Sequence, residues 1–310
     1  MTENVTTAIP KNTFSVTNSS ATLAARQIDF VTKFEKNWNA LREIMGIMRP
    51  IKRENGSTLY TKTATVTLES GTVGEGEVIP FSKATVTETP IGSVSIEKYA
   101  KATSVEAVDK YGSEAAIQMT DDEFRNELTG KILDRFYTYL TGNAGLTNSS
   151  AYGSLQMAIA MAIGKVKDSF KKMRRDSTNI VVFVNTLDAY EYLGAAELTV
   201  QTAFGIDYIQ NFLGAQTVIL SSEIDPGAVF ATPAENIVMY YVDPSNSGFA
   251  QLGLDYTVSG ETNLIGFSAK GNYERAIGEV FALMGVSMFA EYTNGIAKTT
   301  FSTASNVAAG

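Results

Sequence analysis

Three consecutive carboxylates, Asp121-Asp122-Glu123, form a group that could bind a metal ion. The residues around them predict a helix. Consecutive side chains on a helix point in different directions, so these three cannot converge on one ion. We therefore interpret them as part of a solvated helix face and expect no metal site there.

Two other patterns resemble ligand loops. Gly71, Gly74 and Gly76 are spaced G-x-x-G-x-G, whereas a dinucleotide-binding turn needs G-x-G-x-x-G between a strand and a helix. A second strand follows these glycines, which favours a hairpin tip. The loop that starts at Asp243 faintly resembles a calcium loop, but its twelfth position is Leu254 instead of the required glutamate. We reject both ligand sites and expect no cofactor.

The chain has no histidine and no cysteine, which excludes disulfides, imidazole metal ligands and Ser-His-Asp triads. A site built from Asp, Glu, Lys or Tyr stays open, but we expect no enzyme. The net charge of −8 argues against a basic nucleic-acid face as the main function. A basic cluster is interpreted as the wet face of a helix, with contact to an acidic neighbour or nucleic acid as alternatives; it comprises Lys165, Lys167, Lys171, Lys172, Arg174 and Arg175.

The apolar runs are too short for a membrane-spanning helix. Residues 1–25 are polar and carry no signal peptide, so we expect a soluble protein that is intracellular when made.

Residues 59–99 contain two Thr-rich runs joined by a glycine-punctuated tip. Thr and Val favour strands, and ten residues of strand reach about 33 Å. A lone two-stranded ribbon is marginal in water, so this hairpin is expected to lie on another molecule. The first run covers 59–68, and the second starts at 78–80 and resumes at 84–88. The residues expected at an inter-subunit contact are Gly71, Gly74, Glu75, Gly76, Glu77, Val78, Ile79, Pro80 and Lys83.

Residues 1–26 lack periodicity and are expected to form an arm. An amphipathic helix is predicted over 27–48, ended by Pro50. Its apolar stripe either packs in the local core or docks on a neighbouring subunit. Our candidates for docking are Phe34, Trp38 and Leu41.

The rest of the chain alternates helices and strands. A strand is predicted over 91–102, a short helix over 104–111 broken by Gly112, and a long helix from about 113 to 141. A capping box at 120–123 would instead start that helix at Asp121. A compact α/β unit follows over 150–245, with helices at 154–173 and 187–193 and strands at 180–184, 217–220, 228–231 and 237–242. Strands return at 267–270 and 276–292, and residues 299–310 are expected to be loose.

The order of these parts resembles the major capsid protein of tailed double-stranded DNA bacteriophages. Three segments carry the resemblance most clearly: 74–83 in the hairpin, Val105-Glu-Ala-Val-Asp109 and Asn179-Ile-Val-Val-Phe-Val-Asn185. The resemblance implies an α+β chain with the Hong Kong 97-like capsid fold. Its parts would be an N-terminal arm (1–55), an extended β-loop (56–90), a peripheral domain with a long spine helix (91–145 and 246–298), an axial α/β domain (146–245) and a C-terminal tail (299–310).

The resemblance also implies self-assembly into pentamers and hexamers of an icosahedral shell that encloses double-stranded DNA without reading its sequence. The protein would pass from the host cytoplasm to the virion capsid. It would meet a portal and, in some shells, decoration proteins. Because only about 26 polar residues precede the predicted helix, we expect a separate scaffolding protein. Some relatives form Lys–Asn cross-links; Lys62, Lys83 and Asn294 match no such motif, and we assign none.

Two alternatives stay open. The first is an encapsulin, a nanocompartment shell of the same fold, which would need a cargo-peptide groove near the N-terminal helix. The second is a His-free, carboxylate-dependent hydrolase built on the α/β unit.

Overall fold

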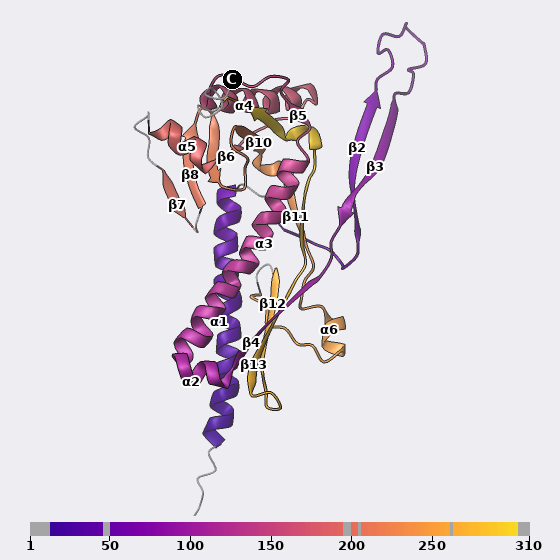
Figure 1. Cartoon of the computed structure of the whole chain (residues 1–310). Helices are drawn as coiled ribbons and strands as arrows, with labels where there is room; N and C mark the ends of the chain where they lie inside the picture. Colours follow the sequence, from indigo (N-terminus) through magenta and orange to yellow (C-terminus); the bar gives the residue numbers. More distant parts are fainter. Residues whose placement is uncertain (1–12, 46–49, 195–199, 204–205, 261–262, 303–310) are drawn as a thin grey trace, which may run out of the picture.

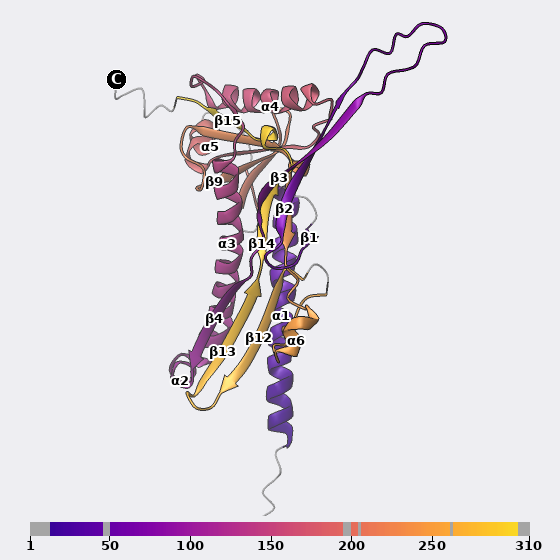
Figure 2. The same cartoon turned by 90° about the vertical axis from the view of Figure 1, so that its right-hand side faces the viewer.

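The computed structural model describes residues 13–45, 50–194, 200–203, 206–260 and 263–302. These residues form three parts, which Figures 1 and 2 show from two sides. A head of sheet and helices lies at one end, a long shaft of two helices and a sheet extends from it, and a two-stranded arm projects away from both.

The head is a seven-stranded mixed sheet with the strand order β5-β15-β10-β6-β9-β8-β7. Helices α4 (Leu155–Lys172) and α5 (Thr186–Leu193) contribute to the apolar cluster that covers one of its faces. The strands are β5 (Leu146–Thr147), β6 (Ile180–Asn185), β7 (Gln201–Ala203), β8 (Ile206–Phe212), β9 (Ala215–Ser221), β10 (Ala228–Pro233) and β15 (Ala297–Thr300).

Strand β6 is the centre of the head, and every one of its residues is buried. It pairs in parallel with β9 and antiparallel with β10. The uninterrupted apolar run at 180–184 predicts such a strand, because both of its faces must be covered. The predicted helices at 154–173 and 187–193 are confirmed as α4 and α5.

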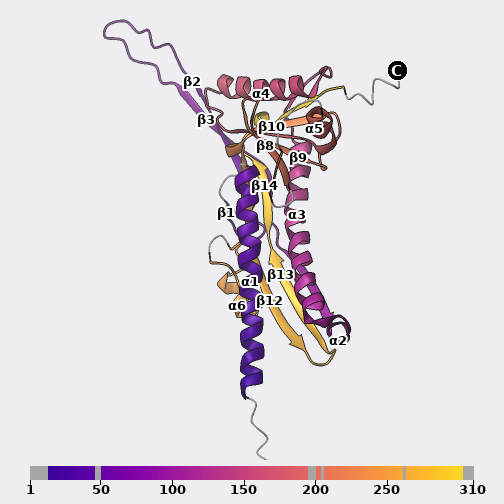
Figure 3. The same ribbon diagram turned by 90° about the vertical axis from the view of Figure 1, so that its left-hand side faces the viewer.

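The shaft is built on α1 (Thr13–Met45) and α3 (Thr120–Gly142), which run along it together (Figure 3). The prediction that residues 13–26 lack a helix is wrong, because α1 begins at Thr13. The predicted end at residue 48 lies outside the described residues. The apolar stripe of α3 faces inward: Leu128, Ile132, Phe136 and Leu140 are all buried.

A bend separates α2 (Val105–Ser113) from the long helix. The Ser104 side chain caps α2 by accepting a hydrogen bond from the amide of Ala107, and Gly112 leaves helical geometry with a φ of 81°. A π-helical turn (Glu114–Met119) then leads directly into α3. The helical path thus resumes close to residue 113, as predicted. The alternative start at Asp121 is wrong, because the hydroxyl of Thr120 donates to the carbonyl of Ala116 instead of capping a new helix.

Two three-stranded sheets complete the shaft and its junction with the head. The first has the order β12-β13-β4, and the second has the order β1-β11-β14. The predicted strand at 237–242 is present but belongs to the second sheet, not to the head. Their bounds are β4 (Glu97–Ser104), β12 (Ile265–Asn272), β13 (Ile277–Met284), β1 (Ile51–Lys52), β11 (Ile237–Tyr241) and β14 (Val286–Ala290). Short helical turns lie at α6 (Ser247–Gln251), η2 (Ala234–Asn236) and η3 (Thr293–Gly295).

The expectation of a loose tail from residue 299 is wrong for the part that the structure describes. Strand β15 lies between β5 and β10 in the head sheet, and Thr299 is fully buried. The hydroxyl of Thr299 donates to the carbonyl of Ala158 in α4 at 2.9 Å. A polar residue can occupy this core because its hydroxyl is satisfied there.

Candidate assembly surfaces

The arm consists of β2 (Thr58–Thr67) and β3 (Lys83–Ser93), which pair antiparallel from Thr58 opposite Ser93 to Thr67 opposite Lys83. Both predicted strands are confirmed at the core of this ribbon. Residues 78–80, predicted as the start of the second strand, are not in strand and belong to the tip. The predicted return strand at 91–102 is divided, because β3 ends at Ser93 and β4 begins at Glu97.

The base of the arm is anchored in a small apolar cluster of its own. Leu59, Val94 and Val242 are each less than 5% exposed there. Gly92, in β3, has a φ of 152°, and an added Cβ would lie 2.5 Å from the ring of Phe289. Val94 occupies the break between β3 and β4, so this break is anchored in the same apolar cluster.

The tip of the arm, residues 68–82, contains a short internal turn. The amide of Gly74 donates to the Glu77 carboxylate at 2.9 Å, and the amide of Glu77 donates to the carbonyl of Gly74 at 3.1 Å. Gly76 has a φ of 83°, a conformation that costs other residues roughly 1–2 kcal/mol. Eight of the nine residues expected at the contact lie in this segment and are exposed: Gly71, Gly74, Glu75, Gly76, Glu77, Val78, Ile79 and Pro80. The ninth, Lys83, is the first residue of β3.

Large apolar side chains stand on the tip without cover. Phe81 is 96% exposed and Val78 is 88% exposed. Ile79 and Leu68 are 70% and 75% exposed. Burying such a side chain is worth roughly 1.5–3 kcal/mol, so four of them provide a strong drive for contact. Our sequence reasoning omitted Phe81 and Leu68 from the contact residues, although their position beside the glycine-rich turn was a usable signal.

The candidate residues of the N-terminal helix lie in a different environment. Phe34 and Trp38 have no exposed surface and belong to the main core of this subunit. Their burial agrees with the alternative in which the apolar stripe of this helix packs in the core of its own subunit. Leu41 lies within α1, but its side chain is outside the described residues. A contact between this helix and a neighbouring subunit stays a prediction.

Asp121 ties three elements of the shaft together. Its carboxylate accepts hydrogen bonds from Arg26 of α1 at 2.5 and 2.7 Å and from Lys101 of β4 at 2.5 Å. Burial alone would raise the pKa of Asp121, but these two cations outweigh it, and the pKa lies below its usual value. The interpretation as a solvated face is therefore wrong for Asp121. Asp122 is exposed and pairs with Arg125.

A groove lies next to this ion cluster, between α1 and the π-helical turn. Its volume is about 480 Å³, and Leu23, Phe30 and Ile117 are among the residues that line it. Arg26 and Lys33 at its rim are paired with Asp121 and Asp29. The groove thus combines apolar walls with a charge-balanced rim.

Asp243 has a structural role that explains the calcium-like pattern around it. The amide and hydroxyl of Ser245 donate to one carboxylate oxygen, and Lys52 of β1 pairs with the other at 2.6 Å. Burial raises the pKa of Asp243, but the hydrogen bonds from Lys52 and Ser245 outweigh it and keep that pKa low. Within the described residues, no group of three or more carboxylates is arranged to hold a metal ion.

The basic cluster lies at the C-terminal end of α4, on its outer face. Lys167, Lys171 and Lys172 are exposed, and Lys172 pairs with Asp168 one helical turn earlier. Cations at this end of a helix also favour its dipole. Arg174, just past the helix, has a φ of 56°, in the left-handed region where glycine is usual. The wet-face interpretation agrees with these positions.

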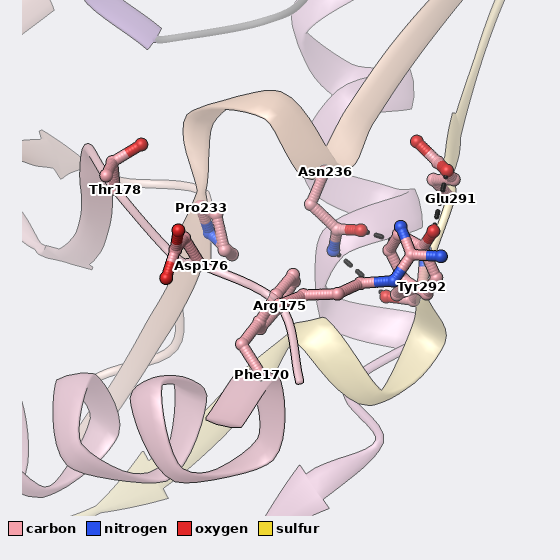
Figure 4. Close-up of a pocket in the computed structure, with 8 residues that line it drawn as sticks. All are labelled: Phe170, Arg175, Asp176, Thr178, Pro233, Asn236, Glu291 and Tyr292. Carbon is pink, nitrogen blue, oxygen red and sulfur yellow. Dashed lines mark hydrogen bonds between the residues drawn. The ribbon is translucent and has the colours of Figure 1, made fainter. Parts of the chain in front are cut away.

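A pocket of about 290 Å³ beside this cluster allows the hydrolase alternative to be examined (Figure 4). Asp176 and Glu291 lie on opposite sides of the pocket and do not converge. The Glu291 carboxylate accepts from the hydroxyl of Tyr292 at 2.8 Å. The amide group of Asn236 exchanges two hydrogen bonds with the backbone of Tyr292, at 2.8 and 2.9 Å. The Asn236 hydrogen bonds join η2 to the segment that follows β14, and the pocket offers no pair of carboxylates for acid–base catalysis.

Within the helices that the structure describes, none is both long and apolar enough to span a bilayer.

The sequence matches no protein-family profile and no curated protein. Solved structures are similar to it over most of the chain. One from the Gordonia phage Cozz aligns with a TM-score of 0.55 at 9% identity, over 85% of this chain and 86% of that one. The capsid structure of the cyanophage P-SCSP1u gives a TM-score of 0.51 at 9% identity, over 84% and 88%.

The holo-SrpI encapsulin complex from Synechococcus elongatus aligns with a TM-score of 0.51 at 11% identity, over 84% of this chain and 90% of that one. Each of these three alignments covers at least 84% of this chain. The chain therefore has the α+β Hong Kong 97-like fold that these capsid and encapsulin structures share.

Proposed function

We propose that this chain is the major subunit of an icosahedral shell, assembled from pentamers and hexamers, and that the shell is a bacteriophage capsid enclosing double-stranded DNA. The observation that carries the proposal is the arm, whose tip holds four large apolar side chains that its own subunit leaves exposed. A subunit that keeps such a surface in solution needs a second molecule to cover it. The shared fold supports a shell as the product of that contact.

The domain boundaries belong to the same proposal. The head would be the axial domain at the centre of each capsomer, and the shaft would be the peripheral domain. On this assignment, the axial domain would include strand β15 beyond the segment 146–245, and β11 would belong to the junction instead. Each arm would lie across a neighbouring subunit, so that many modest contacts add up through symmetry.

The protein's role would be structural and not enzymatic. Its net charge of −8 would limit adhesion of the shell's inner wall to packaged DNA, which allows release of the genome. A strongly positive inner surface would contradict that part of the proposal. A separate scaffolding protein and a portal would take part in assembly in the host cytoplasm, before the protein becomes part of the virion.

An encapsulin shell is the second candidate, and one observation favours it. The groove between α1 and the π-helical turn lies next to the N-terminal helix, where a cargo peptide would have to bind. Its apolar walls, formed by Leu23, Phe30 and Ile117, suit the side chains of a short peptide. The contents of purified particles separate the two functions, since a capsid holds DNA and an encapsulin holds a cargo enzyme.

Electron microscopy and analytical ultracentrifugation of the purified chain test the proposal. We expect closed, symmetric particles at high protein concentration, either alone or with a scaffolding protein. A chain that stays monomeric under both conditions would contradict both shell functions.

A further inference from the structure

The basic cluster carries positive charge, whereas the protein as a whole is acidic. Six Lys and Arg residues lie within 165–175, and the only acidic residue in that stretch is Asp168. Asp168 pairs with Lys172, and Lys165 donates to the carbonyl of Thr147 at 2.6 Å. Lys167, Lys171 and Arg174 have no ion pair among the described residues. The end of α4 therefore presents cationic charge that this subunit does not neutralise.

A groove of about 450 Å³ opens beside that charge, between the arm and the head. One wall comes from the lower part of the arm, at Thr61, Ala64 and Thr89. The other wall includes Met173, at the end of α4, and Arg175, which lies 4.8 Å over the ring of Tyr292. The groove thus offers apolar and hydroxyl walls. Its lining holds one cation, Arg175, and one anion, Glu291, whose carboxylate accepts a hydrogen bond from the Tyr292 hydroxyl. The exposed cations Lys171 and Arg174 lie outside the lining, at the adjoining end of α4.

The tip of the arm has the complementary chemistry. Residues 68–82 carry three glutamates, at 69, 75 and 77, and no Lys or Arg. The same segment exposes Val78, Ile79 and Phe81. An acidic and apolar segment suits a groove with apolar walls that adjoins the basic end of α4.

We propose that the acidic arm tip of one copy docks into the groove beside the basic end of α4 on a second copy. A subunit cannot fill its own groove, because Figures 1 and 2 both show the arm extended away from the head. The contact joins two different surfaces of the same chain, so it is heterologous. Each added copy leaves one tip and one groove open, and such contacts close into rings when the rotation allows. This inference rests on the proposed shell function and names the acceptor for its arm.

Disulfide trapping tests the contact directly, because the chain has no cysteine of its own. One preparation carries Glu75→Cys at the tip, and a second carries Arg174→Cys at the end of α4. When the two are mixed, assembled and oxidised, we expect a disulfide-linked dimer containing one chain of each kind. The control mixes Glu75→Cys with Lys98→Cys, an exposed lysine on the shaft, and should give no such dimer. Equal cross-linking in both mixtures, or cross-linking only in the control, would overturn the proposal.

Charge exchange provides a second readout. Glu69→Lys with Glu75→Lys, or Lys171→Glu with Arg174→Glu, should each lower particle yield about tenfold, while all four changes together should restore it. All four side chains are exposed, so unfolding by denaturant should be unaltered in each variant.

The outcomes separate the acceptor site from the shell function. If every variant assembles like the natural chain, the shell stands and this acceptor is wrong. If particles lose bound DNA in the Lys171→Glu, Arg174→Glu variant and no cross-link forms, the cluster binds nucleic acid instead. If the natural chain never assembles, both the acceptor and the shell function fail.

Discussion

Strand β2 of the arm and strand β6 of the head both consist of residues that favour strands, but β6 is buried and most of the arm is exposed. Every residue of β6 is buried between α4, α5 and the upper shaft, whereas the arm is covered only near its base. Val182 has no exposed surface, and Val66 and Val86 are more than half exposed.

The difference separates two sources of stability. The head supplies its own partners, so its strands contribute to the folding of one subunit. The arm depends on its base cluster for position, and none of the other described elements of the subunit covers its tip. Changes in the head should therefore lower the stability of the monomer, and changes in the tip should lower assembly alone.

The largest expected effect is on folding, from Phe183→Ala in the head. Phe183 is fully buried and its ring lies 5.3 Å from that of Phe136. Removing it should lower the free energy of unfolding by about 3–5 kcal/mol. Denaturant unfolding of the monomer measures this change. A loss below about 1 kcal/mol would mean that the head core is packed differently.

Asp121→Asn should lower the free energy of unfolding by about 3 kcal/mol, because it leaves Arg26 and Lys101 partly buried without their carboxylate. The pKa of Asp121 is lowered in the folded chain, so its contribution is complete above its ordinary value of 3.8 and is lost as pH falls through the lower folded value. Unfolding measured from pH 7 to pH 2 should show this acid-dependent part in the natural chain only. Asp29→Asn, which breaks the exposed pair with Lys33, is the matched control and should change stability by less than about 1 kcal/mol.

Phe81→Ala is the counterpart of Phe183→Ala at the arm tip. Because Phe81 is 96% exposed, the free energy of unfolding should stay within about 0.5 kcal/mol of the natural value. The protein concentration needed for assembly should rise roughly 10- to 100-fold, the equivalent of burying one such ring. Light scattering across a concentration series measures that threshold. An unchanged threshold would show that this ring is not buried on assembly.

The smallest effect is expected from Gly76→Ala. Gly76 has a φ of 83°, so alanine should disfavour the tip conformation by about 1 kcal/mol and raise the assembly threshold about fivefold. Gly71→Ala is the matched control, because Gly71 lacks a positive φ and has open space around it. Equal thresholds for the two variants would mean that the turn of the tip does not matter for assembly.

The sequence predicted those parts whose pattern depends on local burial. The run at 180–184 and the stripe of α4 gave the head, and the Thr-rich runs gave the arm. Features that depend on distant partners were missed. Polar β15 is a strand because β5 and β10 flank it, and Asp121 is buried because Arg26 and Lys101 meet it from other elements. Our list of contact residues reached the tip but omitted Phe81, although its position beside the glycine-rich turn was a usable signal.

Deleting residues 71–83 tests the central claim most directly, since it removes most of the tip and leaves the head and shaft intact. The shortened chain should unfold with the same free energy as the natural chain, and electron microscopy should find no closed shells under conditions in which the natural chain forms them. Normal shells from the shortened chain would contradict the role of the arm in assembly.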